Sequence, residues 1–333
     1  MQKTISIIIA IFNRKDELFE LLNSLIAQTD KNFEVIIVDD GSSVDLLPTV
    51  ETFKEMLEIQ YFKKTNSGPG LSRNYGARRA KNDWLVFVDS DVIVEKDYIE
   101  NIKKNLENTD CAAFGGADKA HKGFNILQKA ISYSMTSVFT TGGIRGSKKA
   151  VTRFQPRSFN MGVNKEIFLK IGGFSEMRIG EDPDLSMTIW ENGYQTAFFD
   201  NIGVYHKRRT DLGKFSKQVY QFGCARPILN QRHPNYVKPT FWFPTLFLLG
   251  YVAGILEYFL LHKGFVLVCY GIYTFVIFFH ALLLTKNLAI AAQAIITTYI
   301  QMFSYGYGFL ESWVKLNILR MKPEEAFPKH FHK

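Results

Sequence analysis

The chain has 333 residues, enough for one large domain or two smaller ones, and its hydrophobic content of 47% is unevenly distributed. Its three cysteines, Cys111, Cys224 and Cys269, are far apart, which argues against a disulfide framework or a zinc site and fits a reducing compartment. The N-terminal apolar run is too short for a secretory signal peptide, so we expect the first 240 residues to stay in the cytoplasm.

The net charge of +8 is concentrated just before residue 240. This basic segment contains Lys207, Arg208, Arg209, Lys214, Lys217, Arg226, Arg232 and Lys238. It precedes residues 241–310, which are dominated by Phe, Leu, Ile, Val and Ala. Basic residues beside a membrane segment favour the cytoplasmic side and attract anionic lipid head groups. Since no recognised nucleic-acid-binding module is present, the pattern predicts membrane lipids, and not nucleic acid, as partners.

The first hundred residues alternate between apolar strands and amphipathic helices. Strands are expected at residues 5–11, 33–38, 61–62 and 84–88, and helices at residues 15–27 and 71–80. The unbroken apolar run at residues 84–88, WLVFV, suits a strand buried on both faces of a parallel sheet. The alternation predicts an α/β fold with a doubly wound, mostly parallel sheet.

Three polar loops fall at the carboxyl edge of this sheet, where ligands bind in open α/β folds. They are residues 12–14, 39–42 and 89–91. Two carboxylates as close as Asp89 and Asp91 repel each other unless a cation lies between them, and Mg²⁺ or Mn²⁺ suits such ligands. A nucleotide could lie across the loops, with Arg73 as an additional phosphate contact. The alternative is structural: residues 39–41 as a turn, Arg73 as a solvated helix charge and the Asp pair as a solvated strand end.

Two later segments, residues 160–162 and 171–185, form the second half of the predicted site. Glu181 and Asp182 lead into a helix that is expected at residues 184–192. Asp182 is either the cap of that helix or a general base that takes a proton from an attacking hydroxyl group. A last strand is expected near residues 198–206; His206 at its end is either a diphosphate contact or a surface residue beside the basic segment.

An ordered set of motifs extends over residues 1–210. It consists of ISIIIAIFNR, IIVDDGSS, LSRNYGARRA, FVDSDV, NMGV and GGFSE followed by GEDPDL. Together these motifs resemble the family-2 inverting glycosyltransferases of the GT-A fold, of the membrane-associated type that assembles exopolysaccharides or lipid-linked glycans. Each motif is weak alone, and the ordered set is specific.

The resemblance implies a hexosyltransferase that uses a nucleotide-sugar donor, preferably a UDP-sugar. It implies Asp39 near the nucleobase, Asp89 and Asp91 as the D-x-D pair with Asp91 as the direct ligand of Mg²⁺ or Mn²⁺, and Asp182 as the catalytic base. The full set of candidate donor-nucleotide residues is Ala10, Asn13, Asp39, Arg73 and Asp89, and Glu181, His206 and Arg226 are candidates for contacts with the acceptor or the diphosphate. Inversion would be a single in-line displacement, with the metal offsetting the charge of the departing diphosphate.

One departure from the family pattern bears on the acceptor. Processive polysaccharide synthases of this family carry Q-x-x-R-W before a membrane helix, whereas no Trp follows Arg226 here. The segment resembles that of single-addition enzymes acting on lipid-linked acceptors. We therefore expect one sugar to be transferred per encounter to the hydroxyl group of a lipid-linked, polyprenyl-borne glycan in polysaccharide biosynthesis. A bare polyprenyl phosphate is the alternative acceptor.

The apolar C-terminal region contains segments long enough to cross a bilayer. Residues 241–261 and 264–285 are strong candidates, and residues 288–309 form a weaker one with several polar side chains. The basic residues after residue 313 prefer the cytoplasm, which favours two crossings and an interfacial helix, whereas hydropathy favours three crossings. Either a helical hairpin or a three-helix region is thus expected. Glu257 is either functional or placed at the membrane interface.

These features predict a multi-pass protein of the inner, cytoplasmic membrane with its catalytic domain in the cytoplasm. The expected divisions are a catalytic domain at residues 1–210, a basic juxtamembrane segment at 211–240, membrane helices at 241–312 and a basic tail at 313–333.

Two functions of other classes fit parts of the pattern. The sequence around Asp89 and Asp91 also resembles haloacid-dehalogenase-type phosphatases, in which Asp89 would be the nucleophile and Asp91 an acid/base. That motif normally opens its domain, however, and here a strand–helix unit precedes it. The other alternative is an inert, membrane-tethered binding module in which Asp182 serves only as a cap.

Overall fold

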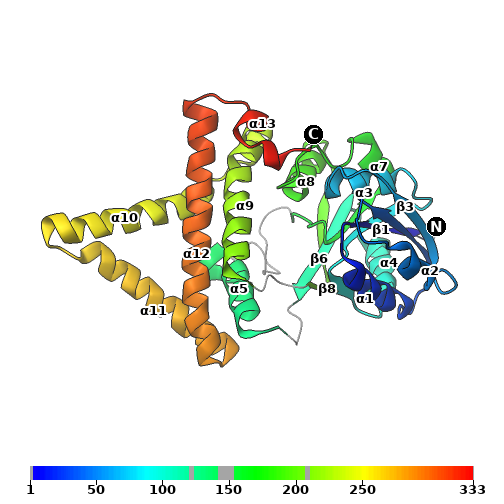
Figure 1. The fold of residues 1–333 in the computed structure, drawn as a ribbon, viewed down its shortest axis with the longest axis horizontal. Coiled ribbons are helices and arrows are strands. Elements are labelled where there is room, and N and C mark those ends of the chain that lie inside the picture. The colour runs from blue at the N-terminus through cyan, green and yellow to red at the C-terminus, as the bar shows by residue number, and fades with distance from the viewer. Residues whose placement is uncertain (1–2, 120–123, 142–153, 207–210, 333) are drawn as a thin grey trace. The chain divides into compact units, whose positions relative to one another are not determined.

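The computed structural model describes residues 3–119, 124–141, 154–206 and 211–332. The chain divides into two compact units. Unit 1 comprises residues 1–121, 148–207 and 329–333, and unit 2 comprises residues 122–147 and 208–328. In Figure 1 the first contains the strands, and the second is helical.

Unit 1 is built on an eight-stranded sheet in the order β3-β2-β1-β4-β7-β6-β8-β5 (Figure 1). Its strands are β1 (Ile5–Ile11), β2 (Phe33–Asp39), β3 (Glu58–Lys63), β4 (Trp84–Asp89), β5 (Val92–Val94), β6 (Ala113–Lys119), β7 (Asn160–Asn164) and β8 (Thr196–His206). Strands β1 to β4 are parallel to one another, whereas β7 runs antiparallel to its neighbours β4 and β6. The predicted α/β fold with a mostly parallel sheet is confirmed.

The helices of unit 1 connect these strands. They are α1 (Lys15–Ile26), α2 (Leu47–Glu51), α3 (Pro69–Ala77), α4 (Tyr98–Asn108), α7 (Lys165–Lys170) and α8 (Glu181–Glu191). Helix α3 begins two residues before its predicted start, because Pro69 has no N–H to satisfy and is suited to a first helical position. Helix α8 likewise begins at Glu181 and not at residue 184, so both carboxylates of the Glu181–Asp182 pair lie in its first turn.

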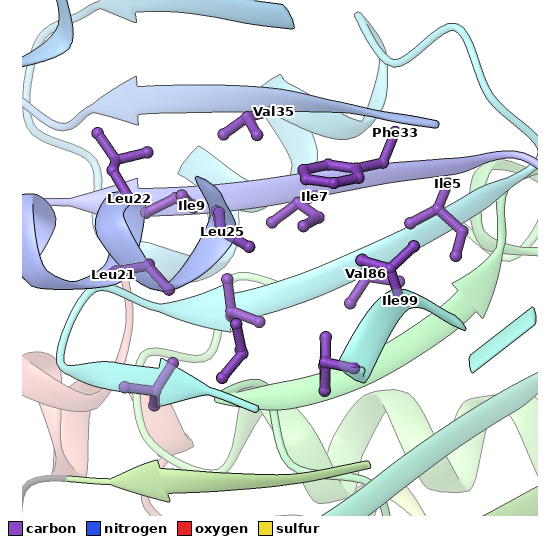
Figure 2. Close-up of a cluster of buried hydrophobic side chains, with 14 of the residues drawn as sticks. Ile5, Ile7, Ile9, Leu21, Leu22, Leu25, Phe33, Val35, Val86 and Ile99 are labelled. Atoms are coloured by element: carbon purple, nitrogen blue, oxygen red, sulfur yellow. The ribbon is translucent and has the colours of Figure 1, made fainter. Parts of the chain in front are cut away.

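The core of unit 1 packs against both faces of the parallel strands. Figure 2 shows Ile5, Ile7 and Ile9 of β1 on the face that also receives the leucines of α1. The alternate residue Ile8 lies on the opposite face, against α3 at Gly76, where an added Cβ would come within 2.8 Å of Ile8. Burial on both faces explains why β1, β2 and β4 are largely apolar in the sequence. The polar exceptions Ser6 and Glu34 are buried, and the Ser6 hydroxyl group donates to Glu34 Oε1 at 2.6 Å.

Unit 2 consists of helices in its described part. These are α5 (Ile126–Thr136), α6 (Val138–Thr141), α9 (Leu212–Arg232), α10 (Phe243–Leu261), α11 (Phe265–Thr285), α12 (Leu288–Trp313) and α13 (Pro323–Ala326), with short 3₁₀ turns at Pro234–Tyr236 and Pro239–Trp242 and a π-helical turn at Val314–Ile318. Three helical segments, Pro239–Leu261, Phe265–Thr285 and Leu288–Ile318, are long and apolar enough to cross a membrane. The sequence predicted all three.

Glu257, near the end of α10, has a structural partner inside the α10–α11 hairpin. Its Oε2 accepts a hydrogen bond from the Val266 backbone N–H, at 3.1 Å, in the first turn of α11. The first N–H groups of a helix have no intrahelical acceptor, and a carboxylate there also interacts favourably with the helix dipole. This contact accounts for an acidic residue in an otherwise apolar segment.

Candidate active site

The three predicted polar loops do lie at one edge of the sheet. In the parallel register Ala10 of β1 lies between Val38 of β2 and Asp89 of β4, so the chain leaves all three strands at the same level. The backbone N–H of Asp40 also donates to the Ile11 carbonyl oxygen at 2.8 Å, which joins the first two loops.

Asn13 and Asp39 hold the first two loops in place. Asn13 has a left-handed backbone (φ 55°), and its Oδ1 accepts hydrogen bonds from the backbone N–H and hydroxyl group of Ser43 at 2.8 and 3.0 Å. Asp39 is fully buried, and its two carboxylate oxygens accept from the Ser42 N–H and the Tyr61 hydroxyl group, each at 2.8 Å. Both side chains are thus committed to ordering the loops after β1 and β2.

Asp40 has a role that the sequence did not predict. Its carboxylate accepts from the backbone N–H groups of Ser67 and Gly68 at 2.9 and 2.7 Å, and it pairs with the Lys64 ammonium group at 2.5 Å. The second loop is thereby tied to the start of α3. The adjacent acids Asp39 and Asp40 were visible in the sequence, but only the fold shows that Asp40 contacts residues 67 and 68.

Arg73 is the centre of the charge arrangement. It is 4% exposed, and its guanidinium donates to Asp89 Oδ1 at 2.7 Å and to Glu181 Oε1 at 2.5 Å. Burial alone would lower the pKa of Arg73, but the charges of Asp89 and Glu181 raise it overall, so the guanidinium stays protonated. Arg73 therefore connects the D-x-D strand end to the start of α8.

Glu181 is buried in the same charge cluster. Burial raises the pKa of its carboxyl group and the neighbouring charge of Asp182 raises it further, while Arg73 opposes both effects. A carboxyl group perturbed by burial and by specific charges is typical of functional sites.

Asp91, the second residue of the D-x-D pair, faces a different arginine. Its Oδ2 accepts from Arg14 Nη1 at 3.0 Å, and its side chain is 15% exposed. Arg14 belongs to the predicted loop 12–14, but its pairing with Asp91 joins residues 77 positions apart and carries no local sequence signal. Each carboxylate of the pair thus has its own guanidinium counter-ion.

Asp182 is held at the start of α8 without serving as its cap. The capping position is occupied by Gly180, and no side chain caps this end of the helix. The Asp182 Oδ1 is buried and accepts no hydrogen bond. Leaving a buried acceptor unsatisfied is costly, and such groups in folded proteins call for a functional explanation. The helix dipole favours a negative charge at this position.

A pair of hydrogen bonds fixes the segment that leads to α8. Asn74 of α3 donates through Nδ2 to the Phe174 carbonyl oxygen at 2.7 Å, and its Oδ1 accepts from the Phe174 N–H at 2.9 Å. Gly173 has a φ of +73°, and a Cβ there would lie 2.5 Å from Asn74 Oδ1. The glycine-rich turn thereby positions Glu181 and Asp182 relative to α3.

We expect Asn74→Ala to lower the free energy of unfolding by about 1–3 kcal/mol, because it leaves two buried backbone groups without partners. Thermal unfolding of the purified protein would measure the loss. Asn108→Ala is the matched control, since the Asn108 amide bonds only to the Lys104 carbonyl oxygen in its own helix. Equal transition temperatures for both variants would contradict the role assigned to Asn74.

The two remaining candidate residues belong to different units. His206 ends β8, where its backbone is in register with Val92 of β5, just beyond Asp91. Arg226 belongs to α9 of unit 2, and its guanidinium lies over the Phe241 ring at 4.3 Å. Asn160 of the predicted second segment is a buried structural residue, because its amide bonds to the Tyr98 hydroxyl group and the Ile202 carbonyl oxygen.

The last residues of the chain return to unit 1 beside this site. Phe331 pairs antiparallel with Met177, and the flanking backbone bonds join Arg178 N to His330 O at 2.7 Å and His332 N to Glu176 O at 2.9 Å. The His332 ring lies against Gly68, where an added Cβ would be 1.7 Å from His332 Cε1. Burial lowers the pKa of His332, and the charge of Arg178 acts in the same direction.

The fold and these motifs are those of a known enzyme family. The family model "Glycosyl transferase family 2" matches residues 6–171. An uncharacterized glycosyltransferase of Haemophilus influenzae is 33% identical over 220 residues, covering 62% of this chain and 70% of that protein. The Bacillus subtilis protein YfnE, also an uncharacterized glycosyltransferase, is 36% identical over 233 residues, covering 66% of this chain and 57% of that protein. The chain belongs to glycosyltransferase family 2.

Other relatives are larger or more distant. The alignments with two Rickettsia glycosyltransferases cover only 17% of the length of those proteins. Among solved structures, a mannosyltransferase from Pyrobaculum calidifontis with GDP-Man and Mn²⁺ superposes with a TM-score of 0.56 at 17% identity, covering 90% of this chain and 86% of that chain. Residues 1–349 of S. aureus TarS with UDP-GlcNAc give 0.51 at 19% identity, covering 90% of each chain. At these identities the likeness concerns the fold.

This chain belongs with the glycosyltransferases by family, and the haloacid-dehalogenase alternative has no support in these relatives. Its Asp89, the nucleophile in that alternative, is instead paired with Arg73 at 2.7 Å.

Proposed function

We propose that this enzyme transfers one sugar, with inversion, from a nucleotide-sugar donor of the UDP type to the hydroxyl group of a lipid-linked glycan at the cytoplasmic face of a membrane. The acceptor oxygen would form a bond to the sugar C1 while the bond from C1 to the diphosphate breaks. The hydroxyl proton would pass to Asp182, and the nucleoside diphosphate would leave.

The observation that carries this proposal is the unpartnered carboxylate oxygen of Asp182. A general base needs a lone pair directed at the site and not committed to another donor. Asp182 Oδ1 is buried and accepts no hydrogen bond, and Asp182 acts electrostatically on both Arg73 and Glu181. The adjacent acid Glu181 is already bound to Arg73, so of the two acids Asp182 is the one available for proton transfer.

The donor would occupy the edge formed by the loops after β1, β2 and β4. The loop shaped by Asn13 and Asp39 would hold the base, and Asp89, 33% exposed, would reach the ribose. Arg73 could exchange one of its two carboxylates for a diphosphate oxygen, because guanidinium groups bind both kinds of oxygen pair.

The carboxylates of Asp89 and Asp91 fit a divalent cation of the Mg²⁺ or Mn²⁺ type. Such ions are often bound by one or two carboxylates together with substrate phosphates. No cluster of three or more acidic, His or Cys ligands occurs in the described residues, so the diphosphate itself would complete the coordination. The ion would supply charge compensation for the leaving diphosphate. Arg14, now 3.0 Å from Asp91, would have to release that carboxylate when the ion binds.

Membrane attachment through the apolar helices of unit 2 supports a lipid-borne acceptor. An enzyme fixed to a bilayer encounters substrates in the same bilayer more often than substrates in solution. A bare polyprenyl phosphate has the same lipid chemistry, and it would give a product with one sugar on a lipid monophosphate.

We expect purified, detergent-solubilised protein to release nucleoside diphosphate slowly from one member of a panel of UDP-, GDP- and dTDP-sugars, through hydrolysis in the absence of acceptor. Release should require Mg²⁺ or Mn²⁺ and stop on addition of EDTA, because the metal offsets the charge of the leaving group. Asp91→Ala should behave as the wild-type protein does in EDTA. Release that persists in EDTA would contradict the metal site. No release from any donor, with or without polyprenyl acceptors, would contradict the proposed reaction.

A further inference from the structure

The chain leaves unit 1 after residue 207 and returns to it at residue 329, with the three apolar helices in between. The return is anchored by the Met177–Phe331 pairing and its two flanking backbone hydrogen bonds. Both ends of the membrane region are therefore attached to the same soluble unit. A chain that starts and finishes on one side of a membrane must cross it an even number of times.

We propose that only the α10–α11 hairpin crosses the bilayer, and that α12 lies along the membrane surface on the side of the catalytic unit. The inference rests on the membrane location proposed above. It decides between the two arrangements that the sequence leaves open, because three crossings would place residues 329–332 on the side opposite their partners in unit 1.

The contacts of α12 with the hairpin support this arrangement. Near its C-terminal end, Gly306 approaches Pro244 at the start of α10, since an added Cβ would lie 2.4 Å from the Pro244 carbonyl oxygen. Near its N-terminal end, Ala291 and Ala294 pack in one cluster with Ile277 and Ala281 of α11. The two contacts on α12 are 12 to 15 residues apart, which is about 20 Å along a helix.

At their other ends α10 and α11 meet. An added Cβ at Gly254 would lie 2.8 Å from Val266 Cγ1, close to the turn at residues 262–264. The backbones of α10 and α11 diverge from this turn, and α12 crosses the base of the hairpin between their far ends (Figure 1). A helix that crosses the base of a hairpin cannot also run parallel to it through the bilayer.

Helix α9 gives a second argument against a third crossing. It lies directly against α12, because added Cβ atoms at Gly223 and Gly308 would lie 2.3 Å from the Tyr305 carbonyl oxygen and 2.4 Å from the Tyr220 carbonyl oxygen, respectively. If α12 spanned the membrane, α9 would enter the hydrocarbon with it. Helix α9 carries Lys214, Lys217, Gln218, Gln221, Arg226, Asn230, Gln231 and Arg232. Placing so many charged and polar groups in hydrocarbon is very costly.

The exposure of the side chains also supports a membrane-spanning hairpin and a surface helix α12. Phe259, Leu260 and Phe265 near the hairpin turn are 69–74% exposed, as expected for side chains that contact lipid. On α12 the buried face is partly polar: the Thr297 hydroxyl group bonds to the Ala130 carbonyl oxygen of α5, and Ser304 bonds to Ser216 of α9. Its apolar residues Leu288 and Ile296 are exposed, which suits a helix with one face toward lipid.

Site-directed labelling tests this topology. The three native cysteines would be replaced, and single cysteines would be introduced by Lys54→Cys in unit 1, Lys263→Cys at the hairpin turn, and Lys286→Cys and Lys322→Cys on either side of α12. All four lysines are exposed. Sealed membrane vesicles of both orientations would be treated with a membrane-impermeant maleimide, with detergent-lysed vesicles as the control for reactivity.

We expect positions 286 and 322 to be labelled from the same side as position 54, and position 263 only from the opposite side. Labelling of position 322 or 286 from the side opposite position 54 would overturn the proposal, and so would labelling of position 263 from the side of position 54. Release of the chain from membranes by alkaline carbonate would instead overturn the membrane location itself. If labelling follows the expected pattern but the protein hydrolyses no donor, the result contradicts the proposed reaction and still supports the topology.

The pairing of Phe331 with Met177 can be tested directly. Met177 and Phe331 form a non-hydrogen-bonded antiparallel pair, because the backbone hydrogen bonds lie on either side of it. In such pairs the two Cα atoms are about 4.5 Å apart, which a disulfide can bridge. The double variant Met177→Cys and Phe331→Cys, in the chain without native cysteines, should form an intramolecular disulfide in intact membranes under mild oxidation. Met177→Cys paired with Lys263→Cys is the control and should not. Failure of the first pair to cross-link while both thiols react with maleimide would overturn the proposal.

Discussion

Asp182→Asn is expected to lower the rate of sugar transfer by roughly 10²- to 10⁴-fold while leaving donor binding unchanged, the usual scale for removing a general base. The amide has nearly the same size as the carboxylate but cannot accept the proton of the acceptor hydroxyl group. Because Asp182 Oδ1 accepts no hydrogen bond in the structure, the substitution breaks no hydrogen bond at that oxygen, so the fold should be retained. The measurement is the transfer rate at saturating donor, together with the dissociation constant of the nucleoside diphosphate.

Two variants on the same helix make this result specific. Glu191→Gln changes an exposed acid at the far end of α8 and should keep the wild-type rate. Glu181→Gln removes a charge that is paired with Arg73, so it should weaken donor binding as well as transfer. Wild-type turnover in Asp182→Asn would assign the base to another group.

The strands of the parallel half-sheet could be predicted because they are buried on both faces. β1, β2 and β4 are largely apolar, and their predicted bounds agree with the structure to within one residue. β6 and β7 were missed because they include Gly115, Gly116 and Gly162, which break the apolar pattern. An added Cβ at Gly162 would lie 2.0 Å from Phe114 Cζ, so the glycine is required by packing between strands that are distant in sequence.

The sequence predicted which loops form the candidate site, but not which side chains pair with one another there. The spacing of Asp89 and Asp91 indicates a strand-end carboxylate pair, and the parallel order of the strands brings it close to the first loop. The choice of Arg14 for Asp91 and Arg73 for Asp89 depends on the packing of α3 and on the geometry after β1. Such long-range pairings have no local signature.

The C-terminal residues illustrate the same limit more strongly. Basic residues after residue 313 suggested a cytoplasmic tail, but nothing in the local sequence indicates that Phe331 pairs with Met177, or that His332 lies on Gly68. These contacts connect the end of the chain to a segment only a few residues before Asp182. The pairing on which the proposed membrane topology rests therefore lies close in sequence to Asp182.

Replacing Arg73 by Met is expected to abolish transfer and to lower the free energy of unfolding by about 3–5 kcal/mol. This is the usual cost of removing one partner of a buried ion pair. Arg73 is 4% exposed, so its removal leaves Glu181, which is also buried, without its cation. Asp89 would lose its partner as well, although at 33% exposure it can be partly compensated by water. Arg73→Lys should not restore function, because an ammonium group cannot reproduce the planar fork that contacts two carboxylates.

The stability loss and the activity loss can be separated by a second substitution. Combining Arg73→Met with Glu181→Gln removes the buried charge left behind, so the double variant should be more stable than Arg73→Met alone, yet equally inactive. Arg78→Met is the matched control, since Arg78 is exposed at the end of the same helix. Thermal unfolding and transfer rate would be measured for the wild type, Arg73→Met, Glu181→Gln, the double variant and Arg78→Met. Additive stability losses would show that Arg73 and Glu181 do not interact, and full activity of Arg73→Met would exclude Arg73 from the donor site. The expected combination, restored stability without restored transfer, follows only if Arg73 both neutralises the buried carboxylates and binds the donor.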